Sequence, residues 1–193
     1  MKKLALVLTV FTASIFGVNA QVQFGIKAGA NFATLSGDDV SGAKTLTGLN
    51  AGVLVKIPLM DKLSLQPEAY YSTQGAKGTE SGTDFTFAIN YINIPVLLKY
   101  QLPVGVFFET GPQFGLRMSA NIKADGQSQD VKDQVKSTDF TWSVGAGYQL
   151  PVIPLGFDVR YNAGLANIEG SSGSGTAKNG VFQVGAFYLF GGK

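Results

Sequence analysis

The sequence predicts an eight-stranded antiparallel up-and-down transmembrane β-barrel, and three observations support this fold class. Eight segments place large apolar residues at every second position, with small or polar residues between them. Charged residues make up only 15% of the chain, whereas soluble domains usually contain about 25%. Short turns that contain proline alternate with longer polar connections, the arrangement expected of a barrel that crosses a membrane.

The alternation assigns one face of each strand to lipid. Successive strand residues point to opposite faces, so Phe24 and Phe32 share one face while Lys27 and Asn31 share the other. Glycine is frequent in the polar rows, which suits the narrow interior of an eight-stranded barrel. We therefore expect the apolar rows to face lipid. A soluble, lipocalin-like barrel with the two faces inverted is the alternative.

Each predicted strand shows this pattern in turn. In chain order, the strands are expected at residues 22–33, 48–57, 63–74, 85–100, 105–118, 139–150, 157–165 and 182–190. Their apolar rows include, in the same order, Phe24, Leu49, Leu65, Ile94, Phe108, Val144, Val159 and Val184. No charged residue falls in an apolar row, where a Lys or Arg at mid-depth would cost about 2–4 kcal/mol.

Two features interrupt the regular pattern. Residues 85–91 are out of phase with the rest of their strand, which predicts a β-bulge there. Pro67, Pro95 and Pro112 lie inside predicted strands. Proline lacks the backbone donor of the ladder, so bulges or register breaks are expected at all three positions.

The connections give the orientation of the barrel. Short turns are expected at residues 58–62, 101–103 and 151–154, and longer polar loops at 36–45, 75–84, 121–138 and 167–179. In outer-membrane barrels the short turns and both termini lie on the periplasmic side. The longer loops of this chain should therefore face outward.

The N-terminal segment resembles a secretory signal peptide. Lys2 and Lys3 precede an apolar run over residues 4–18 and the small-residue site Val18-Asn19-Ala20. The alternative, a membrane anchor, would need about 20 apolar residues. We therefore expect a signal peptide at residues 1–20 and one barrel domain at 21–193. The remaining chain has thirteen basic and thirteen acidic residues, a balance that gives no sign of nucleic-acid binding.

The composition predicts no catalytic, cofactor-binding or metal site. The chain contains neither histidine nor cysteine, which removes the commonest general base and the thiolate nucleophile. We therefore expect a protein that is not an enzyme. The aromatic residues expected to form girdles at the membrane interfaces are Tyr70, Tyr71, Phe85, Phe87, Trp142, Tyr148 and Tyr188.

Charged residues in the polar rows are the candidate functional group of the lumen. They are Lys27, Lys56, Lys99, Arg117 and Arg160 with Glu68, Glu109, Asp139 and Asp158. Buried charges must be paired to be tolerated, so mutual neutralisation is favoured over a conduction or gating path.

Register predicts which of these charges meet. Lys27, Glu68, Glu109 and Arg160 each lie about five or six residues from the short-turn end of their strands, so they should share one height. The strands between them place residues at this level that leave room for long side chains: Gly52, Asn93 or Pro95, Gly145 and Gly185. Arg117 and Asp139 are expected to form a second pair nearer the outer mouth.

Several motifs resemble the small outer-membrane barrels of the porin-like PorT family. They are Phe24-Gly25-Ile26-Lys27-Ala28-Gly29, Leu65-Gln66-Pro67-Glu68, Glu109-Thr110-Gly111-Pro112 and the run at residues 91–100, Tyr-Ile-Asn-Ile-Pro-Val-Leu-Leu-Lys-Tyr. The resemblance implies an outer-membrane location, a structural or envelope-assembly and secretion-related role, and recognition by the barrel-assembly machinery through Tyr188 and Phe190. Gly191, Gly192 and Lys193 follow this aromatic ending, which departs from the commonest form of the signal.

Two other functions remain open from the sequence. The 121–138 loop is long, charged and poor in apolar residues, so the protein could be a surface binding module whose loops contact an envelope partner or an external ligand. In that interpretation, residues 123–136 are dispensable to the scaffold. A small passive pore is the other alternative.

The targeting prediction can be checked on the exported protein. Cell fractionation should recover the mature chain in the outer membrane, and intact-mass measurement should show that it begins at Gln21. Recovery as a soluble periplasmic protein would support the inverted barrel instead. A chain that retains residues 1–20 would favour the anchor.

Overall fold

The computed structural model describes residues 22–37, 43–80, 82–124, 126–170 and 175–191. The predicted signal peptide lies outside these ranges. Within them, the elements are β1 (Gln23–Ser36), β2 (Lys44–Met60), β3 (Leu63–Glu80), β4 (Thr83–Gln101), β5 (Val106–Ala124), β6 (Gln127–Asp130), the 3₁₀ helix η2 (Lys132–Gln134), β7 (Thr138–Gln149), β8 (Leu155–Gly164) and β9 (Lys178–Phe190). No helix of the described residues is long and apolar enough to cross a membrane.

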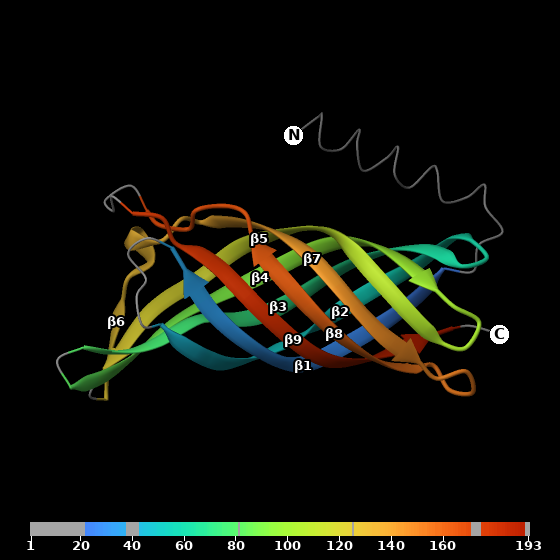
Figure 1. Ribbon diagram of the computed structural model, residues 1–193, viewed down its shortest axis with the longest axis horizontal. Coiled ribbons are helices and arrows are strands. Elements are labelled where there is room, and N and C mark those ends of the chain that lie inside the picture. Colours follow the sequence, from blue (N-terminus) through green and yellow to red (C-terminus); the bar gives the residue numbers. More distant parts are fainter. Residues whose placement is uncertain (1–21, 38–42, 81, 125, 171–174, 192–193) are drawn as a thin grey trace.

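Eight of these strands form a closed antiparallel ring in the order β1-β2-β3-β4-β5-β7-β8-β9 (Figure 1). β9 closes the ring against β1, from the Phe24–Phe190 pair to the Ser36–Lys178 pair. Every strand of the ring is therefore paired on both sides, which satisfies the backbone donors and acceptors that lipid cannot. The predicted fold class is confirmed.

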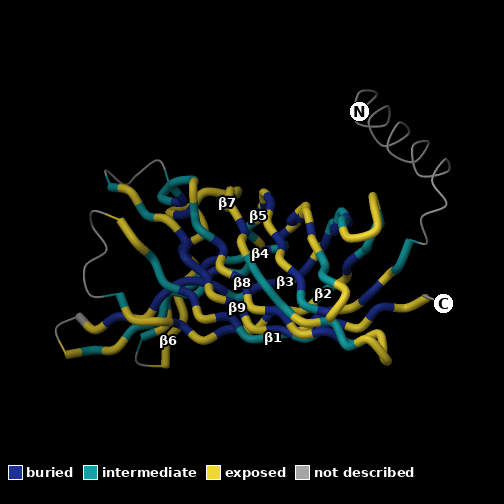
Figure 2. Tube along the Cα trace, turned by 45° about the vertical axis from the view of Figure 1, so that its right-hand side comes forward, coloured by how far each residue is buried: buried dark blue, intermediate teal, exposed yellow. Residues whose placement is uncertain are grey.

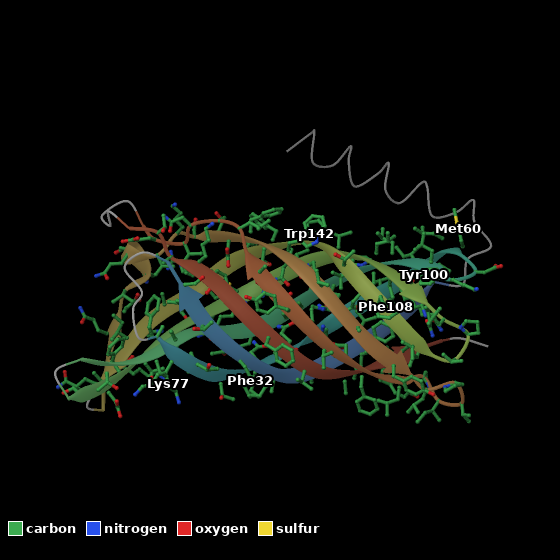
Figure 3. All side chains as sticks on the ribbon, viewed as in Figure 1. Phe32, Met60, Lys77, Tyr100, Phe108 and Trp142 are labelled. Carbon is green, nitrogen blue, oxygen red and sulfur yellow. The ribbon has the colours of Figure 1, made fainter. Side chains whose placement is uncertain are left out.

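The side chains of the barrel follow the predicted face assignment. Phe24 and Leu49 are 62% and 70% exposed on the outside, whereas Asn31 and Glu109 are 0% and 3% exposed inside. Buried and exposed residues alternate along the strands in Figure 2, and Phe32 and Trp142 point away from the barrel in Figure 3. The inverted, lipocalin-like arrangement is therefore wrong.

The expected register breaks at the three strand prolines do not occur. Pro67 pairs with Val96, Pro95 with Gln113 and Pro112 with Trp142, with no register shift at any of them. Instead, each proline coincides with a short gap in the ladder to its other neighbour. A strand residue donates its N–H toward only one neighbour, so proline interrupts one ladder locally and leaves the register intact.

The predicted irregularity near residues 85–91 is present, but the extra residue belongs to the neighbouring strand. The β4–β5 register shifts between Asn90, which pairs with Ser119, and Tyr91, which pairs with Arg117. Met118 of β5 is thus the bulged residue, and the inward row of β4 continues without a change of phase. The upper part of β4 looked out of phase because its inward residues are apolar.

These inward residues belong to a hydrophobic cluster at the long-loop end, here called the outer cluster. Its buried members are Ile89, Tyr91, Ala120, Val131, Val135 and Ile168. Val131 and Val135 flank η2, so the connection between β5 and β7 packs over the strand ends rather than lying free in solvent. This packing argues against the expectation that residues 123–136 are dispensable.

A second cluster, here called the inner cluster, lies near the short-turn end. It consists of Leu54, Phe107, Phe187 and Leu189, all at most 3% exposed. Along β5 the order from the short-turn end is Phe107, then Glu109 and Gln113, then Ala120 of the outer cluster. The polar lumen is therefore enclosed between two apolar layers.

Val131→Ala combined with Val135→Ala should lower the free energy of unfolding by roughly 3 kcal/mol, since each change removes two buried methyl groups worth about 0.8 kcal/mol each. Urea unfolding in detergent micelles, followed by heat-modifiable gel mobility, measures this loss. Lys132→Ala, an exposed change in the same turn, is the control. An unchanged midpoint in the double variant would show that the connection does not stabilise the barrel.

Candidate functional site: the charged lumen

Four of the predicted charges form one buried network. Arg160 of β8 contacts both carboxylates: its Nη2 lies 2.9 Å from Oε1 of Glu68 and 2.6 Å from Oε1 of Glu109. Its Nη1 donates to Oε2 of Glu68 at 3.0 Å, and its Nε donates to Glu109 at 2.8 Å. Lys27 of β1 completes the group at 2.9 Å from Oε2 of Glu68. The structure thus brings together the four residues that register placed at one height.

Glycine leaves the space that the network needs. Gly145 of β7 pairs with Glu109 on one side and Arg160 on the other. A Cβ added at Gly145 would lie 3.1 Å from Oε1 and 3.2 Å from Cγ of Glu109. Gly52 likewise stands beside Lys27 in the β1–β2 ladder. The small residues of the strands that lie between the charged ones therefore allow long side chains to meet across the lumen.

The network is electrically neutral and removed from water. Lys27 and Arg160 balance Glu68 and Glu109, and each of the four residues is at most 5% exposed. The guanidinium of Arg160 makes two hydrogen bonds to each carboxylate, the geometry in which a planar fork binds best. Such an arrangement offsets much of the desolvation cost that makes isolated buried charges unfavourable.

The other lumen charges border this network. The Nζ of Lys99 lies 3.5 Å from the ring centre of Phe107 and 4.4 Å from that of Phe187, which joins the charged level to the inner cluster. It also donates to Gln66, whose amide in turn donates to Glu68. Asp158 is buried and acts electrostatically on Lys27, Lys99 and Arg160.

Lys56 lies beyond the inner cluster and forms no ion pair among the described residues. Its Nζ donates to Gln101 at 2.7 Å and to Gln149 at 3.2 Å. These two glutamines belong to the short-turn ends of β4 and β7. Lys56 therefore bridges strand ends at the rim rather than joining the central charges.

The predicted pair of Arg117 and Asp139 does not form. The Nε of Arg117 instead donates to the backbone carbonyl of Lys136 at 3.2 Å, while Asp139 accepts from Asn179 at 2.7 Å. The bulge at Met118 and the folded connection place a backbone acceptor within reach of Arg117. The alternation of polar and apolar residues contains neither feature.

A layer of amides and hydroxyls lies on the outer side of the charges. Asn31 is its centre: it donates to Ser72 at 2.9 Å and accepts from Asn50 and Gln183 at 2.7 and 2.9 Å. Tyr70, expected in an interface girdle, points into this layer and donates to Gln113 at 2.5 Å. Its place in the inward row could have been found from the alternation, because Ser72 and Gln74 share its parity.

The remaining girdle aromatics divide into two groups. Tyr71, Trp142, Tyr148 and Tyr188 are 39–44% exposed on the outer face, as expected. Phe85 and Phe87 are only partly exposed, and Phe87 packs against the outer cluster. The inward row of β4 thus ends, on the long-loop side, in aromatic residues that the polarity of the lumen would not predict.

Arg160→Met should destabilise the barrel by about 3–5 kcal/mol, because it leaves two buried carboxylates with only Lys27 as a partner. Adding Glu109→Gln to this variant should recover part of the loss, since the second change removes the unpaired charge. A double-mutant cycle from urea unfolding of all four proteins measures the coupling. Strictly additive losses would mean that Arg160 and Glu109 do not interact in the folded protein.

Comparison with known proteins agrees with the geometry. Residues 17–170 match the family described as "Outer membrane protein beta-barrel domain", and a search of curated proteins finds no match. Neisserial surface protein A has a similar structure, with 16% sequence identity and a TM-score of 0.58 over 86% of this chain and 97% of that one. Ail, the attachment invasion locus protein of Yersinia pestis, shows 17% identity and a TM-score of 0.51 over 88% and 99%. With most of its length covered by the family match and a closed eight-stranded ring, this chain belongs to the outer-membrane β-barrel domain family.

Proposed function

We propose that the protein is a non-enzymatic outer-membrane barrel with a closed lumen, which acts as a rigid scaffold in the cell envelope. The observation that carries this proposal is the network in which Arg160 binds Glu68 and Glu109 at once. The three side chains come from β8, β3 and β5, and no two of these strands are neighbours in the ring. Their contacts therefore extend across the lumen rather than along its wall.

The energetics favour a closed state over a passive pore. An ion that passed this level would have to separate Arg160 from at least one carboxylate, and breaking such a buried pair costs about 3–5 kcal/mol. It would also have to cross the inner cluster, where Leu54, Phe107, Phe187 and Leu189 offer no polar group. Three consecutive barriers, one charged and two apolar, thus lie on any path along the axis, the third being the outer cluster.

A role in envelope assembly or secretion, as in the PorT type, is the expectation that follows from the sequence resemblance. The exposed Tyr188 and Phe190 near the end of β9 support recognition by the barrel-assembly machinery. Outer-membrane lipid is the remaining partner, through the large apolar residues on the outside of the barrel. The barrel would then contribute by its place in the outer membrane rather than by catalysing a reaction.

A second candidate function is binding of an external ligand or envelope partner at the long-loop end. The β5–β6 hairpin projects beyond the ring there (Figure 1). A cavity of about 350 Å³ lies against it, lined by Ile122, Ala124, Gln127, Ser128 and Gln129. This volume falls at the lower end of the range for small-molecule sites. Polar side chains at the tip, Lys123 among them, favour a polar partner.

In planar bilayers, the unmodified protein should show little or no steady conductance. Glu68→Gln together with Glu109→Gln should raise small-ion leakage and lower stability, because Lys27 and Arg160 then repel one another with Asp158 as the one remaining carboxylate of the charged level. Conductance and urea unfolding are measured on the same preparations.

Asp130→Asn, an exposed change outside the ring, is the matched control and should leave both quantities unchanged. Large, stable channels in the unmodified protein would establish the pore and refute the closed lumen. A double variant with unaltered leakage and stability would show that the four charges do not close the barrel.

A further inference from the structure

A level of unpartnered polar atoms lies between the amide layer and the outer cluster. Buried side-chain atoms without a hydrogen-bond partner among the described residues include Oδ1 of Asp139, Oδ1 of Asn179, the hydroxyl of Tyr91 and Nδ2 of Asn93. These four residues are at most 3% exposed. Buried polar groups almost always have a partner, so four orphan atoms at one level need an explanation.

The fold brings these atoms together around a glycine. Asn93 of β4 and Asp139 of β7 both pair with Gly115 of β5. A Cβ at Gly115 would lie 2.9 Å from Oδ1 of Asn93, 3.3 Å from Cδ1 of Tyr91 and 3.4 Å from Cβ of Asp139. Asn179 reaches in from β9 to donate to Oδ2 of Asp139 at 2.7 Å, and Tyr91 lies close to both of these side chains. Gly115 thus leaves space between them.

Charge distinguishes this level from the network below it. The charges of Lys27, Lys99 and Arg160 balance those of Glu68, Glu109 and Asp158, whereas Asp139 has no cationic partner within ion-pair distance among the described residues. Arg117, two residues beyond Gly115, turns its Nε to the carbonyl of Lys136 instead. A buried carboxylate without a counter-charge is strongly unfavourable unless something neutralises it.

We propose that Asp139, Asn179 and Tyr91 form an internal site for a small hard cation, of the Na⁺ or Ca²⁺ class. The three free oxygens are carboxylate, amide carbonyl and hydroxyl, and hard cations take such oxygen ligands together with water. Among the described residues, no three His, Cys, Asp or Glu side chains gather as a metal site. The proposed site is therefore a singly charged one, in which the cation supplies the charge that Arg117 does not.

This inference is independent of the closed lumen. The charge network closes the barrel with or without a cation at Asp139, since it lies on the inner side of the amide layer. The cation would instead tie β4, β7 and β9 together beneath the outer cluster. Its expected effect is on stability at the long-loop half of the barrel.

The test uses the purified mature protein folded in detergent micelles, freed of divalent ions and held in N-methylglucamine chloride. NaCl and CaCl₂ are titrated separately at constant ionic strength, and the urea midpoint is followed together with direct binding by calorimetry. One cation or both should raise the midpoint and bind with a stoichiometry near one per chain. Whichever salt acts identifies the ion.

Asp139→Asn should abolish the cation-dependent shift, whereas Asp130→Asn, at an exposed position of the β5–β7 connection, should keep it. Asn179→Asp adds a second carboxylate of nearly the same size and should strengthen Ca²⁺ binding by about tenfold, equivalent to 1.4 kcal/mol. The proposal is refuted if neither cation binds the unmodified protein. It is equally refuted if Asp139→Asn retains the full shift, or if Asn179→Asp leaves Ca²⁺ affinity unchanged.

Discussion

The sharing of Arg160 by Glu68 and Glu109 is the interaction on which the interior of this barrel depends. A ring of strands satisfies its own backbone and faces lipid with its apolar row, but its central interior must still be filled by an inward row that is largely polar. Here one guanidinium joins β8 to β3 and β5, and Lys27 adds β1. Removing any one of the four leaves a charge unbalanced among side chains that are at most 5% exposed.

The rest of the interior provides the space and the hydrogen-bond partners that this network requires. Gly145 and Gly52 provide room beside the long side chains, and the amide layer around Asn31 satisfies the polar atoms on the outer side. Lys99 passes from the charges to the faces of Phe107 and Phe187, so its ammonium group has two aromatic rings and the amide of Gln66 as partners at the transition to the inner cluster. At the other end, the outer cluster covers the lumen with residues of the strands and of the β5–β7 connection.

The period-two pattern was sufficient to predict the ring, the faces of the strands and the meeting of Lys27, Glu68, Glu109 and Arg160. These properties depend only on strand parity and approximate height, which a sequence contains directly. The pairing of Arg117 with Asp139 was wrong, because the bulge at Met118 and the course of the β5–β7 connection determine where Arg117 points. Both are properties of the folded chain.

Three other features of the fold were not predicted by the polarity pattern. Leu54 and Leu189 are apolar residues in rows assumed to be polar, and they are buried because the narrow barrel packs them against Phe107 and Phe187. Val131 and Val135 lie in a segment that is polar on average, so composition concealed their role. Pro67, Pro95 and Pro112 kept their register because an antiparallel strand residue donates toward one neighbour only.

Solvent exchange of the Arg160 side chain tests most directly whether the charge network is closed and dry. The Nε–H of Arg160 donates to Glu109 at 2.8 Å inside a residue that is 1% exposed. In lipid nanodiscs, its proton resonance should remain visible at neutral pH and exchange with water far more slowly than the Nε–H of Arg117, which is part-exposed. Exchange as fast as that of Arg117 would contradict a closed network, because it would mean that water reaches the centre of the lumen.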